Sequence, residues 1–141
     1  DLEIASRAIV DGILLQGVEF DVVGGPTLGA DALTIGIAGI QRCRWFFVRK
    51  KPKGRGTNKL IEGSPIGAGD RCLVVEDAIT TGGSLLKAID AVEATGAKVV
   101  AVSTLVDRGE IARPLIESRE ILYYPLATYL DLGIEPVEIP S

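Results

Sequence analysis

Residues 72–84 combine side chains that could together bind a phosphorylated sugar. An apolar run ends in Glu76 and Asp77, and a turn rich in threonine and glycine then leads into a helical segment. Hydroxyl groups and free backbone N–H groups at a helix N-terminus form a binding site for a phosphate. Carboxylates can hold sugar hydroxyls, or a divalent cation through water. The alternative is a tight strand-to-helix connection in which Thr80 or Thr81 caps the helix.

Residues 49–56 carry five cationic side chains interspersed with glycine and proline, and they follow directly after a second apolar strand. They begin an irregular stretch of a length that, within a compact domain, is commonly a lid or a binding loop. A cationic loop of this kind can close, exclude water and neutralise the charge of a departing pyrophosphate. The alternative is a charged segment that is simply exposed to solvent.

Two further segments could contact a ligand. The small residues at 24–30 would let backbone N–H groups approach an anion closely, although they are equally consistent with a plain turn. Arg108 has a planar guanidinium group that could bind a carboxylate or a base carbonyl. Its alternative role is an ion pair with Asp107 at the start of a helix.

Alternating strands and helices are predicted to position these four segments. The pattern predicts an α/β fold with a mainly parallel central sheet flanked by helices. Ligands of such sheets bind beyond the carboxyl ends of the strands, which is where all four segments lie. The predicted strands are 21–25, 44–48, 71–75, 98–105 and 121–126, and the predicted helices are 2–15, 84–95 and 111–118, with a loop and helix over 27–39.

Length and composition limit the function classes. A chain of 141 residues is expected to form one domain, 1–141. The net charge of -4 argues against a general nucleic-acid binder, and no apolar run approaches the roughly 20 residues that span a bilayer. The chain contains no histidine, which excludes histidine-based catalytic triads and metal sites. Cys43 and Cys72 lie in apolar runs and are expected to be free thiols in a reducing cytoplasm.

Residues 72–84 resemble the phosphoribosyl pyrophosphate (PRPP) signature of type I phosphoribosyltransferases. The Arg49-Lys50-x-x-Lys53 loop and the Asp107-Arg108 pair resemble the orotate phosphoribosyltransferase branch of that family. The resemblance implies the Rossmann-like core of type I phosphoribosyltransferases, with no N-terminal hood evident. It also implies a cytoplasmic, Mg²⁺-dependent enzyme of pyrimidine (UMP) biosynthesis. That enzyme would transfer the 5-phosphoribosyl group of PRPP to orotate, giving orotidine 5′-phosphate and pyrophosphate.

The resemblance further implies roles for individual residues. Lys50, Lys53 and Asp77 would be catalytic, and Arg108 with Thr80 would contact orotate. Mg²⁺ would be held mainly by PRPP, with Glu76 and Asp77 as candidates for contact through water. The family forms homodimers, so loop 49–56 would reach the active site of the neighbouring subunit. The residues implied to bind PRPP are Thr27, Leu28, Gly29, Arg49, Lys50, Lys53, Arg55, Glu76, Asp77, Ala78, Ile79, Thr80, Thr81, Gly82, Gly83 and Ser84.

The resemblance implies that different residues of that set bind three different parts of PRPP. The 5′-phosphate would lie on residues 80–84, the ribose hydroxyls on the two acids, and the pyrophosphate between loop 27–30 and the cationic loop. The chain departs from the family pattern at Arg55, where a histidine is usual, and at 26–29, where many members carry a lysine.

Two other functions remain open from the sequence. The first is a phosphoribosyltransferase for another base, which Tyr123 and Tyr124 could stack against, although core packing explains these tyrosines better. The second is a non-catalytic regulator that senses PRPP or a nucleotide. Retention of the cationic loop argues against the regulator, because a sensor need not stabilise a departing pyrophosphate.

Overall fold

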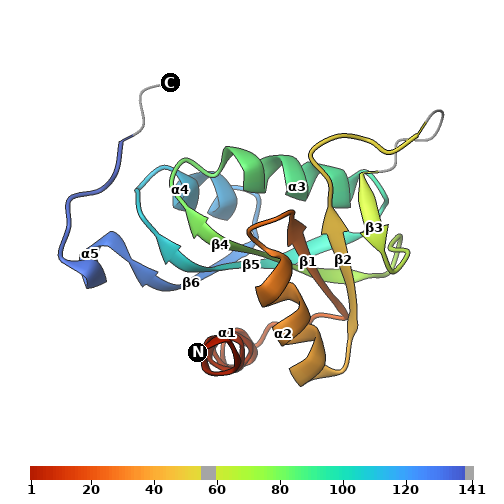
Figure 1. Ribbon diagram of the computed structural model, residues 1–141, viewed down its shortest axis with the longest axis horizontal. Coiled ribbons are helices and arrows are strands. Elements are labelled where there is room, and N and C mark those ends of the chain that lie inside the picture. Colours follow the sequence, from red (N-terminus) through yellow and green to blue (C-terminus); the bar gives the residue numbers. More distant parts are fainter. Residues whose placement is uncertain (55–59, 139–141) are drawn as a thin grey trace.

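The computed structural model of the chain describes residues 1–54 and 60–138, and it has helices on both faces of one sheet (Figure 1). The predicted α/β fold with a mainly parallel central sheet flanked by helices is confirmed. The elements are α1 (Leu2–Leu15), β1 (Val22–Pro26), α2 (Asp31–Gln41), β2 (Arg44–Val48), β3 (Ile61–Gly63), β4 (Arg71–Ile79), α3 (Gly83–Glu93), β5 (Lys98–Asp107), α4 (Ala112–Glu117), β6 (Leu122–Thr128) and α5 (Tyr129–Leu132).

The six strands of the described residues lie in the order β3-β2-β1-β4-β5-β6. Neighbouring strands are parallel except at the edge, where β3 runs antiparallel to β2. From β1 the chain moves outward through α2 to β2, whereas from β4 it moves the other way through α3 to β5. The strand order therefore reverses between β1 and β4. In open α/β sheets the ligand site lies beyond the carboxyl ends of the strands at such a reversal.

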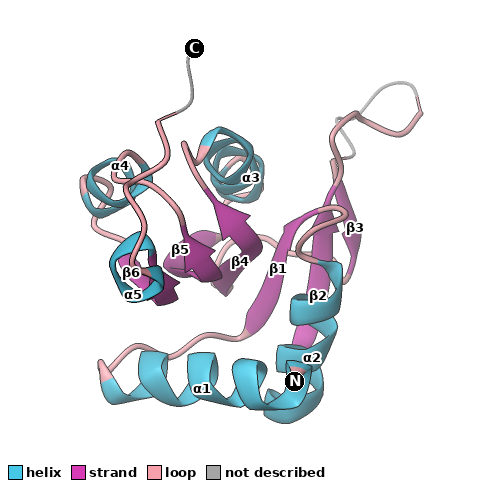
Figure 2. Ribbon diagram, turned by 60° about the vertical axis from the view of Figure 1, so that its left-hand side comes forward, coloured by secondary structure: helices cyan, strands magenta, loops and turns pink. Residues whose placement is uncertain are grey.

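Each face of the sheet has its own hydrophobic core. Helices α1 and α2 cover one face, and α3 and α4 cover the other (Figure 2). Successive residues of a strand point to opposite faces, so Val74 packs into the core beneath α3, whereas Leu73 and Val75 pack against α1 and α2. Burial on both faces explains why β4 begins as a continuous apolar run.

Two local predictions needed correction, and one short helix was not predicted. The predicted strand 71–75 continues to Ile79, because β5 pairs alongside it as far as Asp107, so the acids Glu76 and Asp77 lie within the strand. The stretch predicted to be irregular contains β3, whose three residues pair only with β2. The short helix α5 follows β6 and begins with a capping box formed by Thr128 and Asp131.

The expectation for the two cysteines agrees with the structure. Cys43 and Cys72 are free thiols, the first half-buried and the second buried in the core. Among the residues the structure describes, no helix is long and apolar enough to cross a membrane.

Candidate active site

The loop between β4 and α3 forms a cradle of backbone groups. Helix α3 begins after Gly82, which has no side chain to cap it and adopts a left-handed conformation with φ of 84°. The Thr81 hydroxyl accepts only a long hydrogen bond of 3.4 Å from the Gly83 N–H. Thr80 and Thr81 are therefore not the helix cap, and the first N–H groups of α3 remain available to an anion. The left-handed backbone at position 82 favours glycine, and a Cβ there would also lie 3.0 Å from the Ala112 Cβ.

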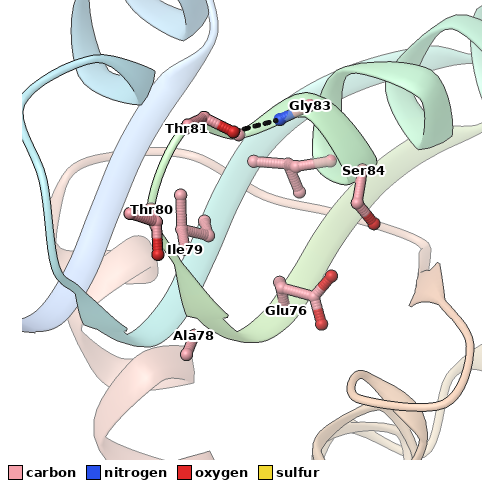
Figure 3. Close-up of a pocket in the computed structure, with 9 residues that line it drawn as sticks. Glu76, Ala78, Ile79, Thr80, Thr81, Gly83 and Ser84 are labelled. Carbon is pink, nitrogen blue, oxygen red and sulfur yellow. Dashed lines mark hydrogen bonds between the residues drawn. The ribbon is translucent and has the colours of Figure 1, made fainter. Parts of the chain in front are cut away.

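A cavity of about 220 Å³ lies over this loop (Figure 3). The predicted phosphate-binding residues are thus brought together around one hollow. Its volume suits a phosphate group with part of the sugar that carries it. The lining residues are Glu76, Ala78, Ile79, Thr80, Thr81, Gly82, Gly83, Ser84 and Leu85.

The two acids differ in environment. Glu76 is 9% exposed, whereas Asp77 is exposed and accepts a 2.8 Å hydrogen bond from the Ala78 N–H. Burial raises the pKa of the Glu76 carboxyl to about 7, and the neighbouring Asp77 carboxyl adds to that rise. The Ser84 hydroxyl, which points toward Glu76 in Figure 3, acts in the opposite direction. Binding of a cation or a hydroxyl donor beside Glu76 would lower this pKa and favour the ionised carboxylate.

The loop after β1 rests directly on these acids. A Cβ at Gly29 would lie 2.6 Å from Asp77 Oδ1 and 2.7 Å from Glu76 Oε1. The Thr27 N–H donates to the Val48 carbonyl at 3.0 Å, which ties the same loop to the end of β2. Loop 27–30, which also contains the exposed Leu28, therefore spans the ends of β2 and β4 at the reversal of strand order.

The cationic loop begins at the end of β2 and extends away from the sheet (Figure 1). The Arg49 N–H donates to the Leu60 carbonyl at 2.7 Å, and the Arg49 guanidinium forms an ion pair with Glu62 of β3. Among residues 1–54 and 60–138, no hydrogen bond or ion pair joins Lys53 to Asp77. The predicted site residue Arg55 lies outside the described residues.

A groove of about 720 Å³ separates the start of this loop from α3. Lys50 lines it from the loop, and Ser84 and Lys87 line it from the helix. The sequence prediction missed Lys87, although its position one helical turn after Ser84 places both side chains on the same face of α3.

Arg108 follows β5 and lies beside the loop between β4 and α3 (residues 80–82), here called the phosphate loop. Its N–H donates to the Ile79 carbonyl at 2.8 Å, and its carbonyl accepts from the Val137 N–H at 2.7 Å. A Cβ at Gly109 would lie 2.8 Å from the Thr80 carbonyl oxygen. The two residues predicted to contact one base, Thr80 and Arg108, are therefore close together.

Comparison with known proteins supports the chemistry of this site. Residues 3–118 match the phosphoribosyl transferase domain family. The orotate phosphoribosyltransferase of Pyrococcus abyssi is 40% identical over 131 residues, which cover 93% of this chain and 71% of the relative. That of Mycobacterium leprae is 45% identical over 123 residues, covering 86% of this chain and 68% of the relative.

A solved structure shows the same similarity. The chain resembles Mycobacterium tuberculosis orotate phosphoribosyltransferase in complex with PRPP, with a TM-score of 0.76 and 37% sequence identity. The match covers 94% of this chain and 76% of that chain. A protein with a similar fold therefore binds PRPP.

Proposed function

The chain belongs to the phosphoribosyl transferase family, within its orotate phosphoribosyltransferase branch, and we propose that it transfers the 5-phosphoribosyl group of PRPP to orotate. The products are orotidine 5′-phosphate and pyrophosphate, and the reaction belongs to pyrimidine biosynthesis. The expected type I phosphoribosyltransferase core is confirmed. The main support for the proposal is that three features lie together at the end of β4. They are the backbone N–H groups of the loop before α3, the two acids beneath Gly29, and Arg108, whose N–H donates to the Ile79 carbonyl.

Each part has a role in the reaction. Residues 80–84 hold the 5′-phosphate, and Glu76 and Asp77 hold the ribose hydroxyls. The bond between the ribose anomeric carbon and pyrophosphate breaks with its electron pair leaving on pyrophosphate. A ring nitrogen of orotate bonds to that carbon and gives up its proton, which passes to the departing pyrophosphate or to water. Such an oxocarbenium-like centre needs a positioned leaving group and charge neutralisation more than a strong base. Arg108 and Thr80 orient orotate for the attack.

The leaving pyrophosphate is held by loop 27–30 and the cationic loop. Lys50 lines the groove beside Ser84. Loop 49–56 would supply Lys53 and Arg55 to the pyrophosphate, which in the dimer proposed below is bound in the neighbouring subunit's site. We assign Arg55 the role of a cationic donor to pyrophosphate, since a guanidinium cannot shuttle protons near neutral pH.

Mg²⁺ fits the donor set as a metal held mainly by the substrate. Glu76 and Asp77 supply two carboxylates at one point beneath Gly29, and no group of three or more metal-binding side chains occurs in residues 1–54 and 60–138. Magnesium is commonly bound by one or two carboxylates, waters and substrate phosphates. When bound, it would neutralise charge on the pyrophosphate.

The proposal also covers the domain organisation, the oligomeric state and the cellular location of the protein. We propose that residues 1–141 are one domain, which the single sheet with helices on both faces supports. We also propose a homodimer in which loop 49–56 serves the neighbouring site, since the described start of this loop extends away from its own sheet (Figure 2). The free thiols Cys43 and Cys72 support a cytoplasmic location.

The two tyrosines do not support another base as substrate. Tyr123 is 4% exposed, and its hydroxyl donates to Asp107 at 2.6 Å. Tyr124 packs over Gly12 of α1, on the opposite face of the sheet. Core packing therefore accounts for both tyrosines.

A base panel tests the proposed function. The purified protein is given PRPP and Mg²⁺ with orotate, adenine, guanine, hypoxanthine or uracil, and loss of the base is followed by its absorbance. Turnover of orotate alone is expected, and omission of PRPP or Mg²⁺ serves as the control. Turnover of another base in preference to orotate would contradict the assignment, and tight PRPP binding without any turnover would instead indicate a regulator.

A further inference from the structure

Asp107, the last residue of β5, is a buried acid to which the proposed reaction gives no role. It is 2% exposed. Its Oδ1 accepts a 3.1 Å hydrogen bond from the Gly109 N–H, and its Oδ2 accepts a 2.6 Å hydrogen bond from the Tyr123 hydroxyl. A buried carboxylate is tolerated only with such partners, because burying it without them is costly. Both oxygens of Asp107 thus have a partner within the protein.

These two hydrogen bonds shape the turn that carries Arg108. An aspartate that accepts from the N–H two residues later forms a tight side-chain-stabilised turn, here closed around Arg108. The Arg108 backbone is held on both sides, by the Ile79 carbonyl and by the Val137 N–H. The exposed side chain of Arg108 therefore projects from a backbone whose position is fixed by three separate segments.

Gly109 makes this arrangement sterically specific. A Cβ at this position would lie 2.8 Å from the Thr80 carbonyl oxygen and 3.1 Å from the Val137 carbonyl oxygen. The phosphate loop and the segment after α5 thus close on the turn from two sides. A shift of the turn would move Arg108 relative to Thr80, its proposed partner in binding orotate.

Tyr123 anchors Asp107 from the neighbouring strand. Its ring lies under the Arg113 guanidinium, whose central carbon is 4.9 Å from the ring centroid. Burial raises the pKa of the Tyr123 hydroxyl, and the hydrogen bond to Asp107 raises it further, so this hydroxyl keeps its proton and remains a donor at physiological pH. Asp107 is thereby connected to β6 as well as to its own turn.

We propose that Asp107, anchored by Tyr123, is a positioning residue that holds Arg108 in place for the carboxylate-bearing base. This inference rests on the proposed function and adds to it a determinant of affinity for orotate that does not act on PRPP. The sugar-phosphate contacts are proposed to lie on β4 and its loop, whereas both side-chain hydrogen bonds of Asp107 are made elsewhere, to Gly109 of the β5 turn and to Tyr123 of β6.

The test compares two substitutions that each remove one hydroxyl. Tyr123→Phe deletes the donor to Asp107 but keeps the ring beneath Arg113. Tyr124→Phe is the matched control, because its hydroxyl makes no hydrogen bond within the described part of the chain and its ring packs on the opposite face. Steady-state kinetics are measured with each substrate varied separately, and unfolding temperatures are recorded for both variants.

Tyr123→Phe is expected to raise the KM for orotate about three- to tenfold, the size of effect that corresponds to the net contribution of one ordinary hydrogen bond. The KM for PRPP is expected to stay unchanged, and Tyr124→Phe should alter neither value. Asp107→Asn, which keeps the side chain's shape, should show the same selective change.

Two results would overturn the inference. One is an unchanged KM for orotate in both Tyr123→Phe and Asp107→Asn. The other is a parallel loss of affinity for orotate and PRPP together with a lower unfolding temperature, which indicates a purely structural role. Failure of the unaltered protein to use orotate would refute the proposed function itself, and the inference with it, before any variant is compared.

Discussion

Gly29 is the position where one added methyl group tests the geometry of the site most directly. In Gly29→Ala, the new Cβ would meet Asp77 Oδ1 at 2.6 Å and Glu76 Oε1 at 2.7 Å, well inside ordinary van der Waals contact. Either the carboxylates or loop 27–30 must move. Leu28 and Gly29 are exposed, so the displacement is relieved locally, and we expect the free energy of unfolding to change by about 1 kcal/mol or less.

The catalytic effect of Gly29→Ala should be much larger. Misplacement of reacting groups by about 1 Å can lower the rate about a hundredfold, equivalent to about 2.7 kcal/mol of transition-state stabilisation. We therefore expect kcat/KM for PRPP to fall by about that factor. The assay is initial-rate kinetics with PRPP varied at saturating orotate, with PRPP affinity measured separately by calorimetry.

Gly39→Ala is the matched control. Gly39 lies within α2, and a Cβ there would meet nothing within 4 Å. Alanine favours a helix over glycine by about 0.5–1 kcal/mol, so this variant should be slightly more stable and fully active. Wild-type kcat/KM in Gly29→Ala would refute the conclusion that loop 27–30 and the two acids form one binding surface.

Three further predictions concern single groups. Because its carboxyl pKa is raised on folding, Glu76 makes the wild-type protein less stable as pH rises from about 4.5 to about 7, and Glu76→Gln removes this pH dependence. The difference in stability between the two proteins should therefore change across that range in thermal unfolding measured without ligand. A difference that does not depend on pH would contradict the prediction. Lys50→Ala should lower kcat about tenfold or more with little change in unfolding temperature, whereas Lys51→Ala should retain activity; equal rates in the two variants would remove Lys50 from its role. Burial raises the pKa of the Cys72 thiol to about 12, so an alkylating reagent should modify Cys43 in the native protein and Cys72 only after unfolding, as mass spectrometry of labelled peptides would show.

The features that depend on short stretches of sequence could be predicted. The apolar run of β4 and the threonine–glycine turn after it lie next to each other in the chain, so the phosphate cradle was identifiable. The proximity of Thr80 and Arg108 also followed, because the carboxyl ends of parallel strands lie at the same edge of a sheet. The resemblance added the identity of the substrates, which no local pattern supplies.

The features that depend on strand register could not be predicted. The hydrogen bond between Tyr123 and Asp107 joins the neighbouring strands β6 and β5, although the register pairs Tyr123 with Val102 and Asp107 with Thr128, and nothing in either strand alone indicates it. The three residues of β3 are too few to show alternation, and their pairing with β2 brings Glu62 to Arg49. Arg55 lies outside the described residues, and its role stays a prediction.

The ion pair between Arg49 and Glu62 has a consequence for how readily the cationic loop changes partners. Both side chains remain partly open to solvent, with 31% and 42% of their surface exposed. Ion pairs of this kind stabilise a protein by about 1 kcal/mol or less. Breaking the pair so that Arg49 can bind pyrophosphate instead would therefore reduce the affinity for the substrate only slightly. If Arg49 binds pyrophosphate as proposed, Glu62 holds the guanidinium before the substrate binds and competes only weakly for it afterwards.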